Sequence, residues 1–358
     1  MSDVLIREVN DRAEDKKLWM DYISHHPDST VYHSLEWRSI FEKSFGYRSW
    51  YLLAEERQKG RIIGALPLFY VSSPFSSRIV SVPFRDRGGI LWDNQAAFDK
   101  MVGKAKSIFD EMKANYFELK SLKAYPQAYV KSHGFLEKFY WVHSCVSLKN
   151  MTAEVLLKKL GPKRRNMIAQ AEKASLIFAD VTESEKGIAQ WYKLHLAAQK
   201  SLGLPPFPLK FFNIMLSELS KNNGIKIFLV KRLSETVAGT IILLHRKTGI
   251  YGYSASHPSA QNYRPNDFML FNAIKWLMNG GFEEFDMGSD SPSQKSLLFF
   301  KRKWLAKQET IPTYSFGSVS SWLSDSSDNR FTFVRKCFRY LPVRLSRMAG
   351  EMTVRYFG

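Results

Sequence analysis

A polar stretch, SASHPSAQNYRPND at 254–267, lies between an apolar strand-like run and an apolar helix-like run. Its second half can begin a helix, because Pro265 suits a first helical turn and Asn262 or Asn266 can cap it. The unpaired N–H groups of such a turn attract phosphate or carboxylate, and the Arg264 guanidinium can hold either anion at two points. The stretch therefore predicts a substrate-binding junction; an ordinary solvated loop with a helix cap is the alternative.

Three other side chains near this junction have types that can do chemistry. His257 can act as a general base near neutral pH, but a histidine in a polar loop is usually exposed to solvent. Asp286 lies at the end of the next strand-like run, and Lys301 follows in a helical pattern. Lys301 gains a functional role only if it points back toward the junction; the alternative is a solvated cation on an amphipathic helix.

Two basic segments suggest anionic partners. GPKRRN at 161–166 places Lys163, Arg164 and Arg165 at the start of a helix, which suits a diphosphate or an RNA backbone, although most charge runs are simply solvated. The segment from residue 330 onward carries seven Lys or Arg against the single Glu351, with apolar residues at helical spacing. A basic amphipathic segment suits an anionic membrane surface, and a tail packed on its own domain is the alternative.

Composition limits the class of protein. A chain of 358 residues with 45% hydrophobic residues is long enough for two folded domains of roughly 150 residues each. The formal charge of +18 favours nucleic acid, a phosphorylated substrate or acidic lipid, or serves solubility alone. Cys145 and Cys337 are the two cysteines, far apart, which argues against a disulfide framework and a structural zinc. Without a signal-peptide pattern or a long apolar run, a cytoplasmic location is expected.

The two halves of the chain repeat one order of elements. The first half predicts strands at 49–56, 61–73 and 78–93, a helix at 94–115, a strand at 117–122, a short helix at 125–135 and closing strands at 139–148. The second half predicts strands at 225–233, 236–246 and 250–257, a helix at 265–279, a strand at 282–289, a helix at 296–308 and a strand at 310–318. Helices in 153–176 and 186–203 precede this second copy. The repetition predicts a pseudo-symmetric pair of αβ units with a cleft between them and a boundary near residue 150.

The sequence also resembles a known family. GYSASHPSAQNYRPNDFMLFNAIKWLMNGGFEEFDMGSDSPSQKSLLFFKRKWLAKQ is similar to the second acyltransferase domain of the Fem-type (FemAB-like) proteins, and SLEWRSIF, IIGALPLF and SVPFRDRGGILWD resemble parts of their first domain. The resemblance covers about residues 25–320. It implies an α/β (α+β) fold of two tandem GNAT-like domains with mixed, mainly antiparallel sheets at 1–150 and 151–322, followed by a basic amphipathic helical tail at 323–358.

The resemblance implies acyl or aminoacyl transfer to an amine of a lipid-linked cell-envelope precursor, in peptidoglycan or exopolysaccharide assembly. It implies an aminoacyl-tRNA or acyl-CoA donor, with tRNA and the inner face of the cytoplasmic membrane as partners, and neither a metal nor a tightly bound cofactor. The chain departs from the family by lacking the helical-hairpin insertion of some members. QNYRPND stands where GNAT enzymes have the Gln-x-x-Gly-x-Gly/Ala loop that grips coenzyme A, which weighs against acetyl-CoA. A CoA-dependent N-acetyltransferase, a non-catalytic binding protein of envelope polysaccharide machinery and a general nucleic-acid-binding protein are the alternatives.

By position, the resemblance implies a set of site residues. The expected catalytic residues are Lys301, Tyr253 and Arg264. The expected substrate-binding residues are Ser254, Asn266, Lys163, Arg164, Arg165, Asp286, Trp37 and Arg38. Transfer would be direct attack by a neutral amine, without a covalent nucleophile, so the protein would mainly position substrates and stabilise charge. Lys301→Ala and Arg264→Ala are expected to lose activity while the fold is kept.

Overall fold

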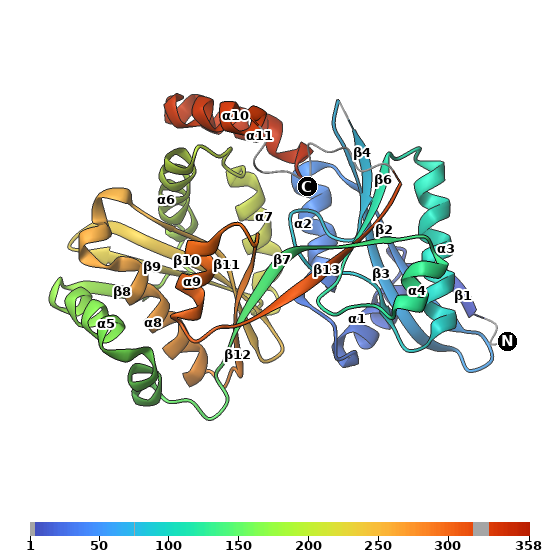
Figure 1. Ribbon diagram of the computed structural model, residues 1–358, viewed down its shortest axis with the longest axis horizontal. Helices are drawn as coiled ribbons and strands as arrows, with labels where there is room; N and C mark the ends of the chain where they lie inside the picture. Colours follow the sequence, from blue (N-terminus) through green and yellow to red (C-terminus); the bar gives the residue numbers. More distant parts are fainter. Residues whose placement is uncertain (1–3, 75, 318–328) are drawn as a thin grey trace. The chain divides into compact units, whose positions relative to one another are not determined.

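The computed structural model describes residues 4–74, 76–317 and 329–358. The chain forms two compact units, each with strands and helices (Figure 1). The first comprises Met1–Trp141, Thr310–Ser326 and Arg355–Gly358, and the second comprises Val142–Glu309 and Ser327–Val354. Two strands, β7 (Leu136–Ser147) and β13 (Lys307–Gly317), contribute residues to both units.

The sheet of the first unit has the strand order β1-β2-β3-β4-β6-β13. All neighbours are antiparallel except β4 and β6. Its strands are β1 (Val4–Glu8), β2 (Arg48–Glu56), β3 (Arg61–Ser72), β4 (Ser77–Val80) and β6 (Tyr116–Lys120), with the short β5 (Leu91–Trp92) paired to β3. The expected strand at 78–93 is therefore wrong over its middle, where a loop joins β4 to β5.

Helices cover both faces of this sheet. Because successive strand residues point to opposite faces, Leu52 of β2 packs with Phe98 in one core, while Tyr51 packs against Trp19 with ring centroids 4.7 Å apart. Phe98 belongs to α3 (Gln95–Glu111) and Trp19 to α1 (Ala13–His25). The remaining helical elements are η1 (Val31–His33), α2 (Leu35–Phe45) and α4 (Gln127–Ser132). The result is a three-layer αβα unit.

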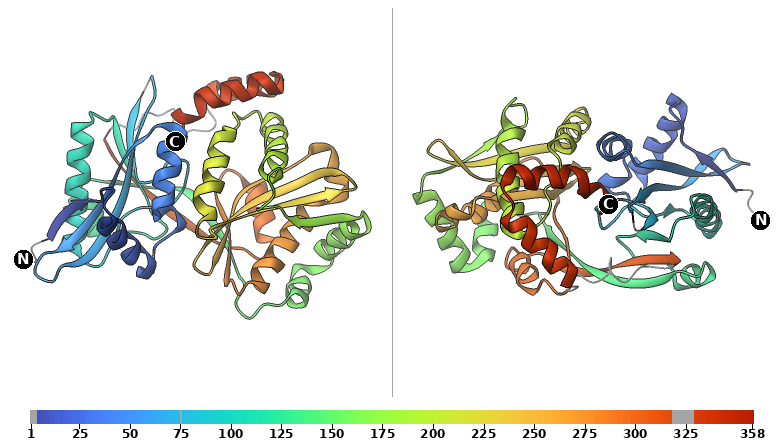
Figure 2. Two further views of the ribbon diagram at one scale, coloured as in Figure 1. Left: turned by 180° about the vertical axis from the view of Figure 1, so that it is seen from behind. Right: turned by 90° about the horizontal axis from the view of Figure 1, so that it is seen from above.

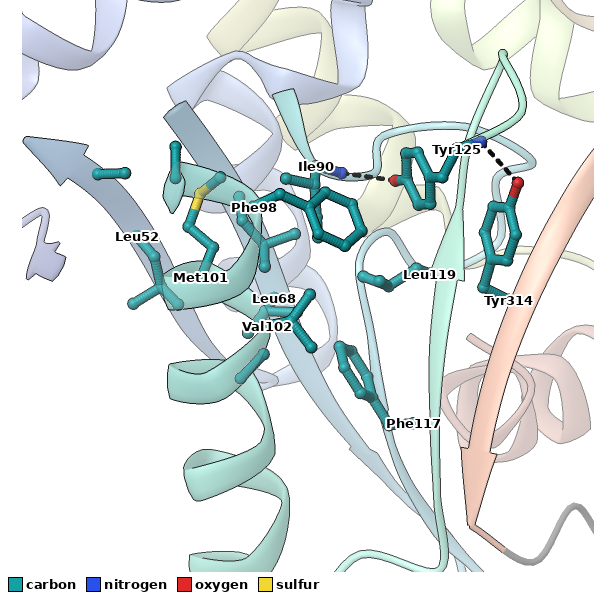
Figure 3. Close-up of a cluster of buried hydrophobic side chains, with 14 of the residues drawn as sticks. Leu52, Leu68, Ile90, Phe98, Met101, Val102, Phe117, Leu119, Tyr125 and Tyr314 are labelled. Carbon is teal, nitrogen blue, oxygen red and sulfur yellow. Dashed lines mark hydrogen bonds between the residues drawn. The ribbon is translucent and has the colours of Figure 1, made fainter. Parts of the chain in front are cut away.

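Strand β13 completes the core of the first unit (Figure 3). The Tyr314 hydroxyl accepts a hydrogen bond from the Tyr125 backbone N–H at 2.7 Å and donates to Glu137 Oε1 at 2.9 Å. The Tyr125 hydroxyl in turn accepts from the Ile90 N–H at 2.8 Å. The two tyrosine rings stack at 4.5 Å, so a residue from late in the chain orders a loop and a helix start from its first half.

The sheet of the second unit has the order β7-β12-β11-β10-β9-β8 and is also mixed. Its strands, besides β7 from Val142 onward, are β8 (Leu176–Asp180), β9 (Ile225–Arg232), β10 (Glu235–His245), β11 (Thr248–Ser256) and β12 (Glu284–Asp290). Helices α5 (Ala153–Lys173) and α8 (Pro265–Asn279) cover one face, and α6 (Gly187–Leu202) and α7 (Leu209–Ser220) cover the other (Figure 2). The expected elements from 225 to 290 are confirmed.

Three local features differ from or refine the expected elements of this unit. Gly161 has φ 78°, so α5 is interrupted there and a helical segment restarts at Pro162, as GPKRRN predicts. The helix expected at 296–308 is shorter, because α9 (Lys295–Arg302) ends before Leu305, whose φ is 67°. The sequence pattern does not predict β8 and α7 in this unit, nor β1, α1 and α2 in the first.

The C-terminal segment forms helices α10 (Asn329–Tyr340) and α11 (Val343–Thr353), then η4 (Val354–Tyr356). Both α10 and α11 contact α6 in the second unit (Figure 1). Of the residues at helical spacing in this segment, Phe338 is buried and Cys337 is exposed. The side chains of Phe331 and Val334, and residues 323–328 of the expected tail, lie outside the described residues.

Candidate functional site

The second unit opens where two parallel strands separate. Strands β11 and β12 pair only over Thr248–Ile250 with Glu284–Asp286. Beyond these residues β11 continues to Ser256, and that edge has no strand beside it in the described part of the chain. Ligands of αβ folds collect at such carboxyl ends, where backbone groups are not used by a neighbouring strand.

A β-bulge in β11 decides which of its tyrosines reaches this opening. Tyr253 lies opposite Ile241 and Tyr251 opposite Ile242, so Gly252 is the extra residue. The two tyrosines therefore point to opposite faces. Tyr253 joins the aromatic cluster beneath α6 and α7, where its ring lies 5.1 Å from that of Phe212. Tyr251 lies on the α8 face and lines the opening.

The opening is a pocket of about 520 Å³. It lies between the end of β11, the carboxyl end of α6, the start of α8, and α9. Its lining residues are Ala198, Ser201, Leu202, Tyr251, Ser254, Ala255, Ser256, Pro258, Gln261, Asn266, Leu270, Leu297 and Phe300. None of these side chains carries a charge, so the pocket offers hydroxyls, amides and apolar surface, and it favours a neutral reacting amine.

Hydrogen bonds orient the polar side chains of the pocket. Burial raises the pKa of Tyr251 to about 12, against the opposing effect of a hydrogen bond with the Ser254 side chain. The phenol is therefore a proton donor at neutral pH. Gln261 donates to Ser256 Oγ at 2.8 Å and accepts from Asn266 Nδ2 at 3.3 Å. These contacts link the end of β11 to the first turn of α8.

The start of α8 is already occupied by an internal ion pair. Arg264 adopts a left-handed backbone with φ 56° as the N-cap, and Pro265 opens the helix. Asp267 in the first turn pairs with Arg164, whose guanidinium also lies 4.7 Å from the centre of the Phe300 ring. A carboxylate near a helix N-terminus satisfies the positive end of the helix dipole. The predicted pairing of Arg164 with an external anion therefore competes with Asp267.

Lys301 is buried beside the pocket rather than in it. Its ammonium donates to the Met287 carbonyl at 2.6 Å and the Gly288 carbonyl at 3.2 Å, and it pairs with Asp290 at 2.6 Å. Only 5% of the residue is exposed. These contacts attach α9 to the diverging end of β12. Because Leu297 and Phe300 of α9 line the pocket, Lys301 supports its wall.

The other predicted site residues lie in different places. Asp286 is buried and accepts from His143 Nε2 at 3.0 Å and from the Gly288 N–H at 2.7 Å. Lys163 and Arg165 are exposed at the restart of α5. Trp37 and Arg38 belong to the first unit: Trp37 is fully buried, and Arg38 donates to the Val9 carbonyl at 3.0 Å and to Glu42 at 3.1 Å.

The pocket thus brings together Ser254 and Asn266 from the predicted set, while Arg264 is exposed next to it in the chain. Exposed His257 contacts Ser259 Oγ at 2.7 Å and does not line the pocket. Sequence reasoning missed Tyr251 and Gln261. The signal for Tyr251 was available in Gly252 between two tyrosines, because glycine inside a strand often marks a bulge.

Two further features were sought in the described residues: a cluster of metal-ligating side chains and a helix able to cross a membrane. No group of three His, Cys, Asp or Glu side chains in the described part of the chain could hold a metal ion. None of the described helices is both long and apolar enough to cross a bilayer.

Comparison with known proteins agrees with this architecture. Residues 162–296 match the acetyltransferase (GNAT) domain family. The matched residues include the pocket lining except Leu297 and Phe300 of α9, and the two mixed αβα units have the fold of tandem GNAT proteins.

Solved structures of similar fold cover both units. The structure of FemX has a TM-score of 0.71 at 14% identity, covering 88% of this chain and 97% of FemX. The L-PGS structure from Bacillus licheniformis has a TM-score of 0.56 at 12% identity, covering 94% of this chain and 99% of that one. A tandem GNAT protein of clavulanic acid biosynthesis has a TM-score of 0.58 at 9% identity, covering 89% and 100%. No curated protein matches the sequence.

Proposed function

We propose that this protein transfers an acyl or aminoacyl group to an amine of a cell-envelope precursor. The observation that supports the proposal most is the uncharged pocket at the diverging ends of β11 and β12, most of which lies in the region that matches the GNAT family. The resemblance to Fem-type proteins, together with the similar fold of FemX, makes peptidoglycan precursors the class of acceptor to test first.

In the proposed reaction, the neutral amine attacks the carbonyl carbon of the activated acyl group. A C–N bond forms and the bond from the carbonyl carbon to the leaving oxygen or sulfur breaks, while the amine proton passes to the leaving group. Hydroxyl and amide donors can stabilise the oxyanion that develops. Tyr251 and Ser254 are our candidates for this role, because Tyr251 stays protonated at neutral pH and both side chains line the pocket.

The start of α8 favours an aminoacyl ester over acetyl-CoA as the donor. Coenzyme A needs backbone N–H groups for its diphosphate, and here the first helical residue is Pro265, which has none. Asp267 two residues later, paired with Arg164, already lies at the positive end of the helix. We assign Arg264, Lys163 and Arg165 to the phosphate-bearing parts of donor or acceptor, since all three are exposed.

Mass spectrometry of envelope precursors from cells with and without this gene tests the proposal. We expect one precursor to lose a constant mass in the deletion strain, and that mass identifies the transferred group. Identical precursor masses in both strains would contradict the proposed function.

Purified protein then tests the site. Asn266→Ala is expected to lower transfer from aminoacyl-tRNA to the identified precursor, because Asn266 lines the pocket. Asn262→Ala is the matched control, since Asn262 is an exposed asparagine of the same segment outside the pocket lining. An acetyl-CoA arm run in parallel distinguishes the donors. Equal activity of the two variants would reject the site.

A further inference from the structure

Helix α11 packs on the second unit through its small residues. Ser346 and Gly350 are buried. Gly350 lies so close to Pro206 that a Cβ at this position would be 2.3 Å from the Pro206 carbonyl oxygen. A contact this close needs glycine at position 350. The inward face of α11 is therefore the face on which its backbone approaches Pro206, and it carries small residues rather than large apolar ones.

The large apolar residues of α11 point the other way. Leu345, Met348 and Met352 are 49%, 58% and 70% exposed, and their spacing of three and four residues places them on one face. Val343 and, at the end of α10, Tyr340 are exposed as well. A surface helix ordinarily buries such residues and exposes small or polar ones, so this arrangement is inverted. We name Leu345, Met348 and Met352 the docking face.

Basic side chains are exposed on the same two C-terminal helices. Arg335, Lys336, Arg339 and Arg344 are exposed on α10 and α11. Arg347 pairs with Glu351 at 2.9 Å, and Glu351 is the one acidic residue of the sequence from 329 to 358. The surface therefore combines exposed apolar side chains with an excess of positive charge, which complements an anionic lipid surface.

We propose that the docking face binds an anionic lipid bilayer, with α11 lying in the plane of the interface. The apolar side chains would enter the boundary between headgroups and acyl chains, and the arginines would contact phosphate groups. This goes beyond the basic segment that the sequence suggests from residue 330 onward, because it assigns the membrane contact to α11 and names the side chains that insert.

Helix α6 contacts α10 and α11 and also lines the pocket. The carboxyl end of α6 supplies Ala198, Ser201 and Leu202 to the pocket lining. Gly203, which caps α6 in a left-handed conformation, packs against the backbone of α10, since a Cβ there would be 2.3 Å from the Arg335 carbonyl oxygen. Resting on the proposed function, this connection implies an acceptor amine carried by a membrane lipid. The lipid binding itself does not depend on catalysis.

Co-sedimentation of the full chain with vesicles tests the docking face. We expect binding to mixed phosphatidylcholine–phosphatidylglycerol vesicles that weakens as salt increases, and little binding to phosphatidylcholine alone. M348S/M352S is expected to weaken binding about tenfold or more, because burial of methionine side chains contributes on that scale. The matched control is I177S/L233S, which removes two exposed apolar side chains elsewhere in the same unit.

Two double variants with the same loss of net charge distinguish contact by the C-terminal helices from general electrostatic attraction to the vesicle. R339Q/R344Q is expected to weaken binding more than K173Q/K186Q, although both lower the net charge equally and all four residues are exposed. Wild-type affinity of M348S/M352S, or equal losses in the test and control pairs, would overturn the proposal. A dimer or protein complex that forms without lipid and is lost in M348S/M352S would also overturn it, because the docking face would then bind a protein.

Failure here can be distinguished from failure of the proposed function. The vesicles contain no precursor, so their binding reports on the docking face alone. M348S/M352S is expected to keep transfer to a water-soluble acceptor and to lose transfer to the same acceptor in vesicles. If neither variant nor wild type transfers any group, the proposed function fails while the vesicle result stands.

Discussion

At the scale of single residues, the most informative finding is that the predicted catalytic cation, Lys301, holds structure together. It neutralises Asp290 and binds two carbonyl groups at the end of β12. Removing one partner of a buried ion pair leaves the other uncompensated, which is far costlier than breaking an exposed pair. The sequence-level expectation that Lys301→Ala keeps the fold intact therefore needs revision.

We predict that Lys301→Met lowers the free energy of unfolding by about 3–5 kcal/mol, measured by urea denaturation. The double variant Lys301→Met/Asp290→Leu should recover part of that loss, because no buried charge is left alone. Arg302→Met, at the exposed neighbour on α9, should change stability by less than about 0.5 kcal/mol. A double variant no more stable than the single one would show that the ion pair does not cause the loss.

A second residue-scale prediction concerns pH. His195 is 3% exposed, its Nε2 accepts the Phe207 N–H at 3.2 Å, and burial lowers its pKa to about 3. In the unfolded chain its pKa is about 6.5, so stability is full above that pH and falls as the pH drops toward 3, by up to about 1.4 kcal/mol per unit. Unfolding measured between about pH 4 and about pH 7 should show a flatter slope for His195→Gln. Exposed His257→Gln is the control and should retain the wild-type slope.

At the scale of elements, close approach of α6 to β10 positions one wall of the pocket. A Cβ on Gly239 would lie 2.9 Å from Trp191 Cδ1 and 2.7 Å from Leu229 Cδ2. Trp191 is fully buried on α6, so the helix has little room to move away from a larger residue. Gly239 thus allows the close packing of α6, the helix that lines the pocket and contacts α10 and α11.

We predict that Gly239→Ala lowers the free energy of unfolding by about 1–3 kcal/mol, as overpacking does elsewhere. Gly103→Ala is the contrasting change, because Gly103 is exposed on α3 and a methyl group added there would have nothing within 4 Å. It should raise stability by about 0.5–1 kcal/mol through the better helix propensity of alanine. Thermal unfolding measures both, and stabilisation by Gly239→Ala would contradict the packing argument.

At the scale of the whole molecule, each unit depends on distant parts of the chain. The first unit uses β13, whose residues Thr313–Gly317 pair with β6. Tyr314 from this strand fixes Tyr125 and Glu137 by hydrogen bonds. A division of the chain between residues 141 and 310 therefore separates β13 from the core that it completes.

We predict that a fragment of residues 1–141 has low solubility and weak amide protection in β6, because the edge of that strand is uncovered. Fusing residues 310–317 to the fragment through a flexible linker should restore protection in hydrogen exchange. The control fusion carries Tyr314→Phe, which should restore it only in part. Full protection in the unfused fragment would show that β13 is dispensable.

Local pattern was enough to predict much of this molecule. Apolar alternation and turn residues predicted the strands and the helix from 225 to 290, and Gly161 with Pro162 predicted a helix start. These features depend on neighbours in the chain, so they can be found without tertiary information. The basic amphipathic character of the C-terminal segment was visible for the same reason.

Tertiary structure decided what these elements do. Regular alternation would put Tyr251 and Tyr253 on one face, and only the bulged pairing with β10 shows that Tyr251 lines the pocket. Likewise, Asp267 and Asp290 determine whether Arg164 and Lys301 can meet a substrate, and Pro206 determines which face of α11 is outward. The sequence by itself determined the elements from 225 to 290 and the helix start at Pro162, since periodicity and turn residues are local. The partners of buried charges and the direction of bulged strands were decided by contacts between residues far apart in the chain.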